Sequence, residues 1–354
     1  MPRKKTPPGP HEGDEYGYDP AARHRARIRD LFDHDMGDRG KPNQLAKAAS
    51  VPKITVFQKR LIDAAVSIRQ AAAEELLFAH AVLCQTCLPA KKPDDEVRRW
   101  VRQQGRALLT LEAGTAYHPK IKDYVPLGLP YGPKARLILM HLNSEAMRTG
   151  SPDIDAGASL TAFVRRVQDH DPTGPEIRMF KEQLARLSAA MVRLAITEGD
   201  RAMQIDTKVV GAFDLWFPRD ENQRVLWPTT VRLSLDYFES LTRYAVPLDE
   251  RAIAVLSHSA LALDVYCWLA QRLHRIPQGK AQFVPWTSLQ EQFGQGYGEV
   301  RFFRRDLLKL LTQVKSVYDA ARFHADKKGM YLWTSPPPVA KRLLALGSDK
   351  LIDL

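Results

Sequence analysis

Arginine and lysine side chains gather near the end of the chain, where the spacing predicts a helix and then a hairpin. Residues 301–328 hold eight basic and three acidic residues. One side of the predicted helix, Glu299–Tyr318, is apolar, and the other carries most of these cations. Arginine near a helix start can bond guanine at two atoms, and lysine pairs with phosphate. We therefore predict DNA contact through Arg301, Arg304, Arg305, Lys309, Lys315, Lys327 and Lys328.

A second, weaker set of cations lies in the middle of the chain. A predicted long helix, Glu176–Ile196, and the short helix before it, Leu160–Val167, carry them. Glu182 can accept a hydrogen bond from cytosine or pair with an arginine one turn away. Because the charge excess is smaller, a solvated helix face is the alternative to DNA contact. The residues are Arg165, Arg166, Arg178, Lys181 and Arg186.

The elements that would position these side chains follow the same order twice. In the first block, a helix over Lys134–Arg148 precedes the two helices just named, and short strands are predicted within 203–233. In the second, the helices Arg251–Ile276 and Trp286–Phe293 precede Glu299–Tyr318. A hairpin follows, with its turn at 326–329, where glycine accepts positive φ. Helix, short helix, long helix and hairpin is the order of a winged helix, whose long helix enters the major groove.

The segment before these blocks carries further elements. Apolar residues at steps of three and four predict a helical stretch from Phe57 to Leu88. Acidic residues at 94–96 predict a helix start, because they favour a first turn. Arg106–Leu111 is predicted to be a strand, and the segment from His118 to Pro133, rich in proline and glycine, a loop.

These patterns predict an α+β fold, mostly helical, with two tandem winged-helix domains. The N-terminal residues are rich in proline, glycine and mixed charge, which is typical of a disordered tail. The predicted divisions are a disordered charged tail at 1–55, an N-terminal winged-helix domain with a helical and strand extension at 56–245, a C-terminal winged-helix domain at 246–340 and a C-terminal tail at 341–354.

Composition favours a polyanionic partner. The 354 residues include 52 Lys and Arg against 41 Asp and Glu, a formal net charge of +11. Three cysteines cannot build a disulfide framework, which indicates a reducing compartment. No apolar run approaches the ~18 residues of a membrane span, and the basic N-terminus lacks the apolar core of a secretory signal. We expect a soluble, cytoplasmic protein with no membrane association.

Motifs for catalysis and cofactor binding are missing from the sequence. Gly40-Lys41 and Gly279-Lys280 are followed by Pro42 and Ala281, so neither pair belongs to a P-loop. There is no His-x-His, no Gly-x-Ser-x-Gly and no His-Glu-x-x-His. Cys84 to Cys87 is a C-x2-C without a second pair, so small buried side chains explain it better than zinc or redox chemistry. We expect no catalytic residues, no metal and no cofactor.

Both blocks carry an ordered set of short sequence segments. The segments of the first block are 78–89, 128–133, 135–137, 144–149 and 181–188, and those of the second are 247–249, 258–259, 261–269, 285–286, 292–294, 303–306 and 335–337. Through these segments, from about Phe78 to Val339, the sequence resembles the RepA replication initiators of bacterial plasmids.

The resemblance implies a role that the spacing does not show. Such proteins bind repeated double-stranded sites, called iterons, at the plasmid origin and promote opening of an adjacent AT-rich segment. With the host initiator DnaA they recruit the replicative helicase, and they often exist as a homodimer that represses its own promoter or as a monomer that initiates. The resemblance therefore implies plasmid copy control and a place on the plasmid or nucleoid.

Two other functions remain open from the sequence. A winged-helix transcriptional regulator would use the same basic helices at a promoter operator without a role in replication. An enzyme acting on nucleic acid would need clustered acids to hold Mg²⁺, and the sequence offers no such cluster. The first block also has an alternative role, as a dimerisation module that leaves DNA binding to the second.

Overall fold

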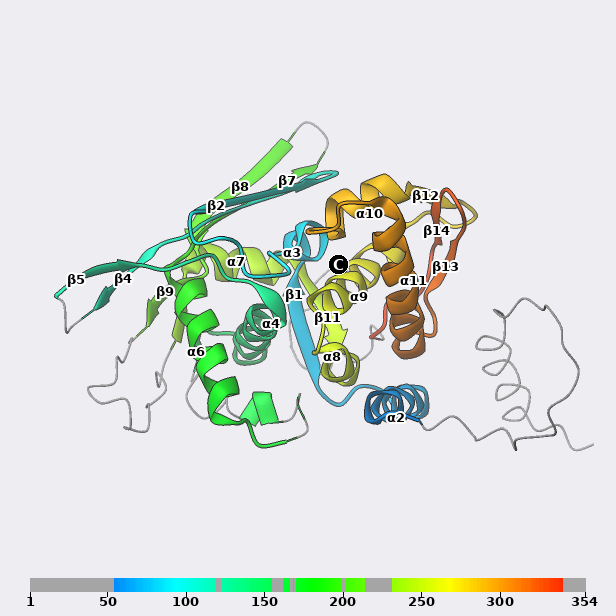
Figure 1. Ribbon diagram of the computed structural model, residues 1–354, viewed down its shortest axis with the longest axis horizontal. Coiled ribbons are helices and arrows are strands. Elements are labelled where there is room, and N and C mark those ends of the chain that lie inside the picture. The colour runs from blue at the N-terminus through cyan, green and yellow to red at the C-terminus, as the bar shows by residue number, and fades with distance from the viewer. Residues whose placement is uncertain are drawn as a thin grey trace, which may run out of the picture. The chain divides into compact units, whose positions relative to one another are not determined.

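The computed structural model describes residues 54–118, 122–154, 162–165, 168, 170–198, 201–213 and 231–339 (Figure 1). The predicted tails therefore lie outside the described residues, apart from Ile54 and Thr55. Arg166 and most of the predicted strand at 224–233 also lie outside. Helices and strands mix throughout the described part, so the predicted α+β class is confirmed. None of the described helices is both long and apolar enough to cross a bilayer.

The segment predicted to be helical from Phe57 to Leu88 forms two helices with a strand between them. Helix α2 (Val56–Gln70) starts at a capping box made by Thr55 and Gln58. Strand β1 (Leu76–His80) and helix α3 (Ala81–Thr86) follow. The prediction was wrong at β1 because this strand pairs antiparallel with β11 (Ala245–Asp249), a partner 165 or more residues away that no local pattern reveals.

Two further helix predictions differ from the structure because the residues belong to, or lead into, a four-stranded antiparallel sheet. Its order is β2-β3-β7-β8. The helix predicted to start at 94–96 is a turn into strand β2, and the helix predicted to reach Ile196 ends at Ala189, because the next residues form β7 between β3 and β8. The strands are β2 (Arg99–Gln104), β3 (Ala107–Glu112), β7 (Met191–Glu198) and β8 (Arg201–Lys208).

The predicted loop from His118 to Pro133 overlaps a small hairpin, β4 (Thr115–His118) and β5 (Asp123–Pro126). The remaining elements of the first half surround helix α4 (Gly132–Thr149), which is buried along most of its length. Helix α6 (Gly174–Ala189) begins at a capping box between Thr173 and Glu176. The others are β6 (Asp153–Ile154), β9 (Val210–Phe213), β10 (Val231–Leu233) and α7 (Leu235–Tyr244), with sheet order β6-β10-β9.

The second half follows the predicted order closely. The helix predicted over Arg251–Ile276 is interrupted at 257–259, where Ser259 caps the second piece. Its parts are α8 (Glu250–Leu256), α9 (Ala260–Arg272) and the 3-10 turn η1 (Leu273–Arg275). The rest is β12 (Gln282–Pro285), α10 (Trp286–Phe293), α11 (Val300–Val317), β13 (Arg322–Ala325) and β14 (Gly329–Trp333), in a sheet ordered β12-β14-β13.

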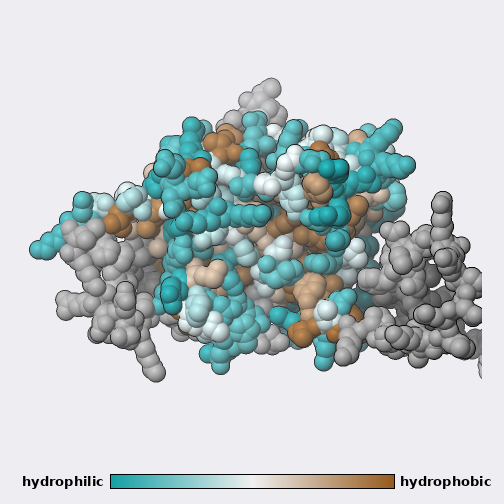
Figure 2. All heavy atoms as spheres, in the orientation of Figure 1, coloured by the Kyte–Doolittle hydropathy of each residue, from teal (hydrophilic) through white to brown (hydrophobic). Residues whose placement is uncertain are grey.

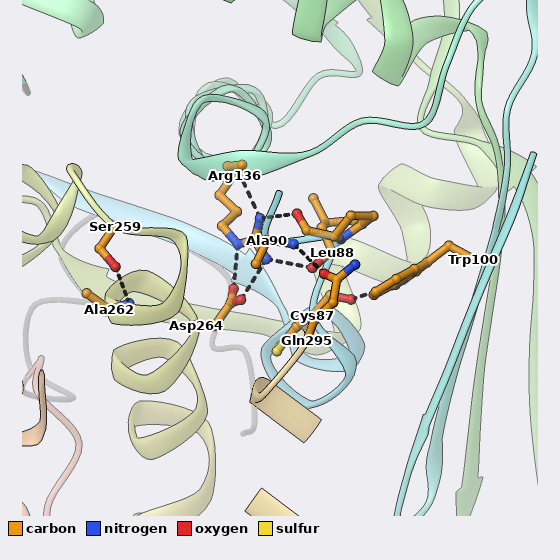
Figure 3. Close-up of polar contacts among 11 residues, drawn as sticks. Cys87, Leu88, Ala90, Trp100, Arg136, Ser259, Ala262, Asp264 and Gln295 are labelled. Atoms are coloured by element: carbon orange, nitrogen blue, oxygen red, sulfur yellow. Dashed lines mark hydrogen bonds and ion pairs between the residues drawn. The ribbon is translucent and has the colours of Figure 1, made fainter. Parts of the chain in front are cut away.

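The two halves share one hydrophobic core, and β1 with β11 runs through the middle of the molecule (Figure 1). The predicted boundary between Ala245 and Val246 falls inside β11, a strand whose partner belongs to the first half. Figure 3 shows a second joint, in which Arg136 on α4 reaches Asp264 on α9. A strand pair and a buried ion pair therefore join the two halves.

Candidate nucleic-acid interface

Helix α11 has the two faces that its sequence predicts. Phe303, Leu307, Leu310, Leu311, Val314 and Val317 are buried. Arg301, Phe302, Arg305, Lys309 and Thr312 are exposed on the other side. The buried row packs the helix against α9, α10 and α2. The exposed row is therefore free of a folding role and is available to a partner.

Helix α10 fixes the hairpin and α11 in place. Trp286 donates from its backbone N–H to the carbonyl of Lys328 (3.3 Å) and from its indole N–H to the carbonyl of Asp326 (3.0 Å). Gly294 follows α10 and lies against the last turn of that helix. A Cβ at this position would lie only 2.7 Å from the Gln290 carbonyl oxygen. The turn between α10 and α11 thus needs glycine.

The three arginines at the start of α11 differ in their surroundings. Arg301 pairs with Glu299 (2.8 Å) and Arg305 with Asp306 (2.9 Å), and both guanidinium groups are more than half exposed. Such water-screened pairs exchange at little cost. The Arg304 side chain instead lies 5.5 Å from the Trp286 ring centre, and its Nε is buried without a hydrogen-bond partner. Arg301 and Arg305 can leave their carboxylates for DNA, whereas Arg304 mainly braces α10 against α11.

The two lysines predicted to contact DNA from α11, Lys309 and Lys315, also differ in their surroundings. Lys309 is exposed on the face between Arg305 and Thr312. The Lys315 ammonium donates to the carbonyl oxygens of Asp319 (2.5 Å) and Ala321 (2.6 Å) beyond the end of the helix. Partial burial lowers the pKa of this ammonium. Lys315 thus caps the chain after α11, and we leave it out of the proposed interface.

The hairpin turn, residues 326–329, presents Lys327 and Lys328. The Asp326 carboxylate accepts hydrogen bonds from the backbone N–H groups of Lys328 (2.7 Å) and Gly329 (2.9 Å). These bonds lower the pKa of Asp326, so it stays ionised while shaping the turn. Both lysine side chains are exposed, and the edge of the molecule formed by β13 and β14 is largely hydrophilic (Figure 2). The turn therefore offers two cations beside α11.

The cations predicted in the first half are only partly available. Arg186 is packed on Tyr131, donates to the Leu129 carbonyl (3.1 Å) and pairs with Glu182 (2.8 Å), which settles the choice for Glu182 in favour of a salt bridge. The Arg186 side chain also fills the space beside Gly128, where a Cβ would lie 2.2 Å from it.

The remaining cations predicted in the first half lie before α6 and on it. Arg165 pairs with Asp171. Arg178 is exposed on α6, and the half-buried Lys181 lies one turn further along the same helix. Burial lowers the pKa of Lys181. The first half therefore brings together fewer exposed cations than α11 does.

Sequence reasoning missed Phe302. Its ring is 41% exposed, with the Arg301 guanidinium 4.7 Å and the Arg305 guanidinium 5.6 Å from its centre. The signal was the pair Phe302-Phe303, because consecutive helix residues point 100° apart and only one of them can be in the core. An exposed aromatic ring among arginines adds an apolar contact to a basic surface.

Among the described residues, no group of three His, Cys, Asp or Glu side chains could hold a metal ion. Cys84, Cys87 and Cys267 are buried free thiols. Burial, followed by the nearby Asp264, raises the pKa of Cys87 well above its usual value. That thiol is therefore a poor nucleophile.

The comparison with protein families then settles what the sequence resembles. Residues 129–288 match RepA_C, described as plasmid encoded RepA protein. The resemblance to RepA is thereby confirmed over this stretch, which runs from just before α4 into α10. The match to RepA stops before α11 and the hairpin turn. The cations at those two places therefore lie outside the matched residues.

Two solved structures of RctB domains 2 and 3, one of them a selenomethionine derivative, also align with the chain. Each structure is 10% identical to this chain in sequence and aligns with a TM-score of 0.43. The alignment covers 71% of this chain in both cases, 96% of the selenomethionine derivative and 94% of the second RctB structure. A TM-score this low carries no argument about fold or function. No curated protein matched the chain in the sequence comparison.

Proposed function

We propose that this protein is a plasmid replication initiator that binds repeated double-stranded DNA sites at its origin. The RepA match over 129–288 supports the replication role. The observation that carries DNA binding is the exposed face of α11, with Arg301, Phe302, Arg305 and Lys309 beside the lysines of the hairpin turn. Basic side chains clustered on one face of a helix are the electrostatic footprint of nucleic-acid binding.

In this proposal the second half is a winged helix. Helix α9, strand β12, helices α10 and α11 and the β13–β14 hairpin follow the order of that motif. The start of α11 would enter the major groove, where Arg301 and Arg305 reach guanine edges and Phe302 meets a thymine methyl group. Lys327 and Lys328 would contact phosphates of the backbone beside the groove.

The first half would supply a second reading unit. Helix α6 is followed by the β7–β8 hairpin, as α11 is followed by β13–β14. Arg178 and Lys181 are the cations that α6 offers. Because the halves share one core, they would dock as a unit on major-groove faces about one turn apart, giving a site of ~20 bp without inverted symmetry.

Opening of the origin would come from strain placed on AT-rich DNA rather than from chemistry on it. The proposal therefore includes no catalytic step, no metal and no nucleotide. DnaA and the replicative helicase of a bacterial cytoplasm are the proposed partners. A homodimer that represses its own promoter would provide copy control.

A test is whether the gene with its flanking DNA maintains a plasmid that cannot otherwise replicate. We expect maintenance with the intact gene and loss with Arg301→Ala and Arg305→Ala together. The alternative is a winged-helix regulator at an operator, which the same basic face favours. That protein would repress a promoter reporter yet maintain no plasmid, and this result would refute the initiator role.

A further inference from the structure

A polar cavity of about 220 Å³ lies between the four-stranded sheet and the end of α9. Its lining residues come from the β2–β3 turn and β7, from α3, and from α9, η1 and β12. None of its lining residues belongs to α11 or to the hairpin turn. The polar side chains that matter are Arg106, Thr197, Gln271, Arg272, Arg275 and Gln282.

Three arginines line this cavity, and no carboxylate is among the described residues that line it. Arg272 is held in place, because its Nε donates to the Gln282 side-chain oxygen (3.1 Å) and its guanidinium lies 5.5 Å from the Trp268 ring centre. Arg106 and Arg275 are exposed and form no ion pair among the described residues. Three cations that line one cavity without a counter-charge repel one another, and an anion would relieve that repulsion.

Gln271 adds an amide to the same wall. The residue lines the cavity and is only 4% exposed. A side-chain amide carries two N–H donors, which suit an anion held by neighbouring guanidinium groups.

We propose that this cavity binds a phosphate group. Guanidinium groups match the paired oxygens of phosphate, and the Gln271 amide can donate a further hydrogen bond. The volume is below the ~300–1,000 Å³ typical of pockets for drug-sized ligands, which favours phosphate, pyrophosphate or a single phosphodiester over a whole cofactor. The source is either a free phosphate compound or the backbone of a nucleic acid. This site stands apart from α11 and does not depend on the proposed function.

Calorimetric titration of the full chain with pyrophosphate, at constant ionic strength, tests the proposal. We expect saturable binding of one pyrophosphate per chain. Arg106→Gln with Arg275→Gln should weaken it at least tenfold. Lys59→Gln with Arg243→Gln removes the same charge from exposed positions that neither line the cavity nor belong to the proposed DNA surface, and should leave it unchanged. An absence of saturable binding, or equal losses in the two double variants, would overturn the site.

Gln271→Leu keeps every charge and nearly the same volume. We expect several-fold weaker pyrophosphate binding from it, with unfolding at the same temperature as the wild type. Unchanged affinity would refute the amide's part in the site. A short duplex of random sequence then identifies the source: displacement of pyrophosphate assigns the cavity to a backbone phosphate, and simultaneous binding assigns it to a free phosphate compound.

Discussion

Arg136 and Asp264, 128 residues apart, form a buried two-point ion pair that joins the halves of the protein (Figure 3). Nε and Nη2 of Arg136 each donate to one carboxylate oxygen of Asp264 at 2.6 Å. The guanidinium also donates to the carbonyls of Leu88, Pro89 and Gly132, so all its donors point at acceptors of the chain. Burial raises the pKa of Asp264, and the facing guanidinium opposes that rise.

Removing one partner of this pair should destabilise the fold strongly. Arg136→Met or Asp264→Asn leaves buried polar groups without their charge partner, and we expect a loss of about 3–5 kcal/mol in the free energy of unfolding. Arg232→Ala breaks the exposed pair with Asp153 and should cost less than about 1 kcal/mol. Urea denaturation measures both. A loss under 1 kcal/mol at Arg136 would show that the pair does not hold the halves together.

Stability should fall below neutral pH because of His80. This side chain is buried, accepts from the Val82 N–H and lies 2.9 Å from the Ser240 hydroxyl. Burial lowers its pKa from 6.5 to about 4. The unfolded chain therefore takes up a proton first, and the free energy of unfolding drops as the pH falls from 6.5 to 4, by up to about 3 kcal/mol. His80→Asn keeps a cap for α3 and should flatten this profile; an unchanged profile would assign the pH dependence to other groups.

Neighbouring arginines at the start of α11 should behave differently. Arg305→Ala removes an exposed side chain that pairs with Asp306 and lies beside the Phe302 ring, so we expect ~1–3 kcal/mol weaker DNA binding and relaxed preference at one base pair. Arg304→Ala removes the contact with Trp286 and should lower the free energy of unfolding instead. Binding to sites with single base-pair changes, beside urea denaturation, separates the two. Equal weakening on every site by Arg305→Ala would place it on the backbone.

Lys327→Ala with Lys328→Ala should weaken binding to all sequences alike. Two lost phosphate contacts should reduce the slope of log K against log salt by about 2. Lys280→Ala is the control, because Lys280 lies away from the turn. The C-terminal end of β12, Pro285, pairs with Gly329 at the turn, whereas Lys280 precedes the N-terminal end of that strand. Altered base preference in the double variant would mean that the turn does not lie on the backbone.

Phe302 should sense thymine methyl groups. Phe302→Ala keeps all charges of α11 and should lose about 1 kcal/mol of binding to the native site, at the low end for a base contact. Replacing each thymine of the site in turn by uracil removes a single methyl group. One position should weaken the wild type and leave Phe302→Ala unaffected. If every uracil substitution affects both proteins equally, Phe302 does not read that methyl group.

The sequence predicted the elements whose signals are local. Helix α11 and the β13–β14 hairpin appear within one or two residues of their predicted bounds, because an amphipathic row, Gly294 and the Asp326–Gly329 turn define them. Strands β1 and β7 were missed because their apolar spacing also suits a helix. Only their pairing with β11 and β3 makes these segments strands.

The same limit applies to the candidate site. Arg301, Arg305 and Lys309 are exposed as the helical pattern predicts. Arg186 is withdrawn from the surface by its contact with Tyr131, a residue 55 positions earlier. Arg304 is likewise held by its contact with Trp286. When the partner of a side chain comes from a distant part of the sequence, the local periodicity of the helix does not reveal the contact.

The most direct test of DNA binding through α11 is a footprint on the DNA flanking the gene, at physiological salt, with wild type and Arg301→Ala/Arg305→Ala side by side. We predict regular protected direct repeats beside an AT-rich stretch, and their loss in the variant. A single protected inverted repeat, or a variant footprint equal to that of the wild type, would contradict the account.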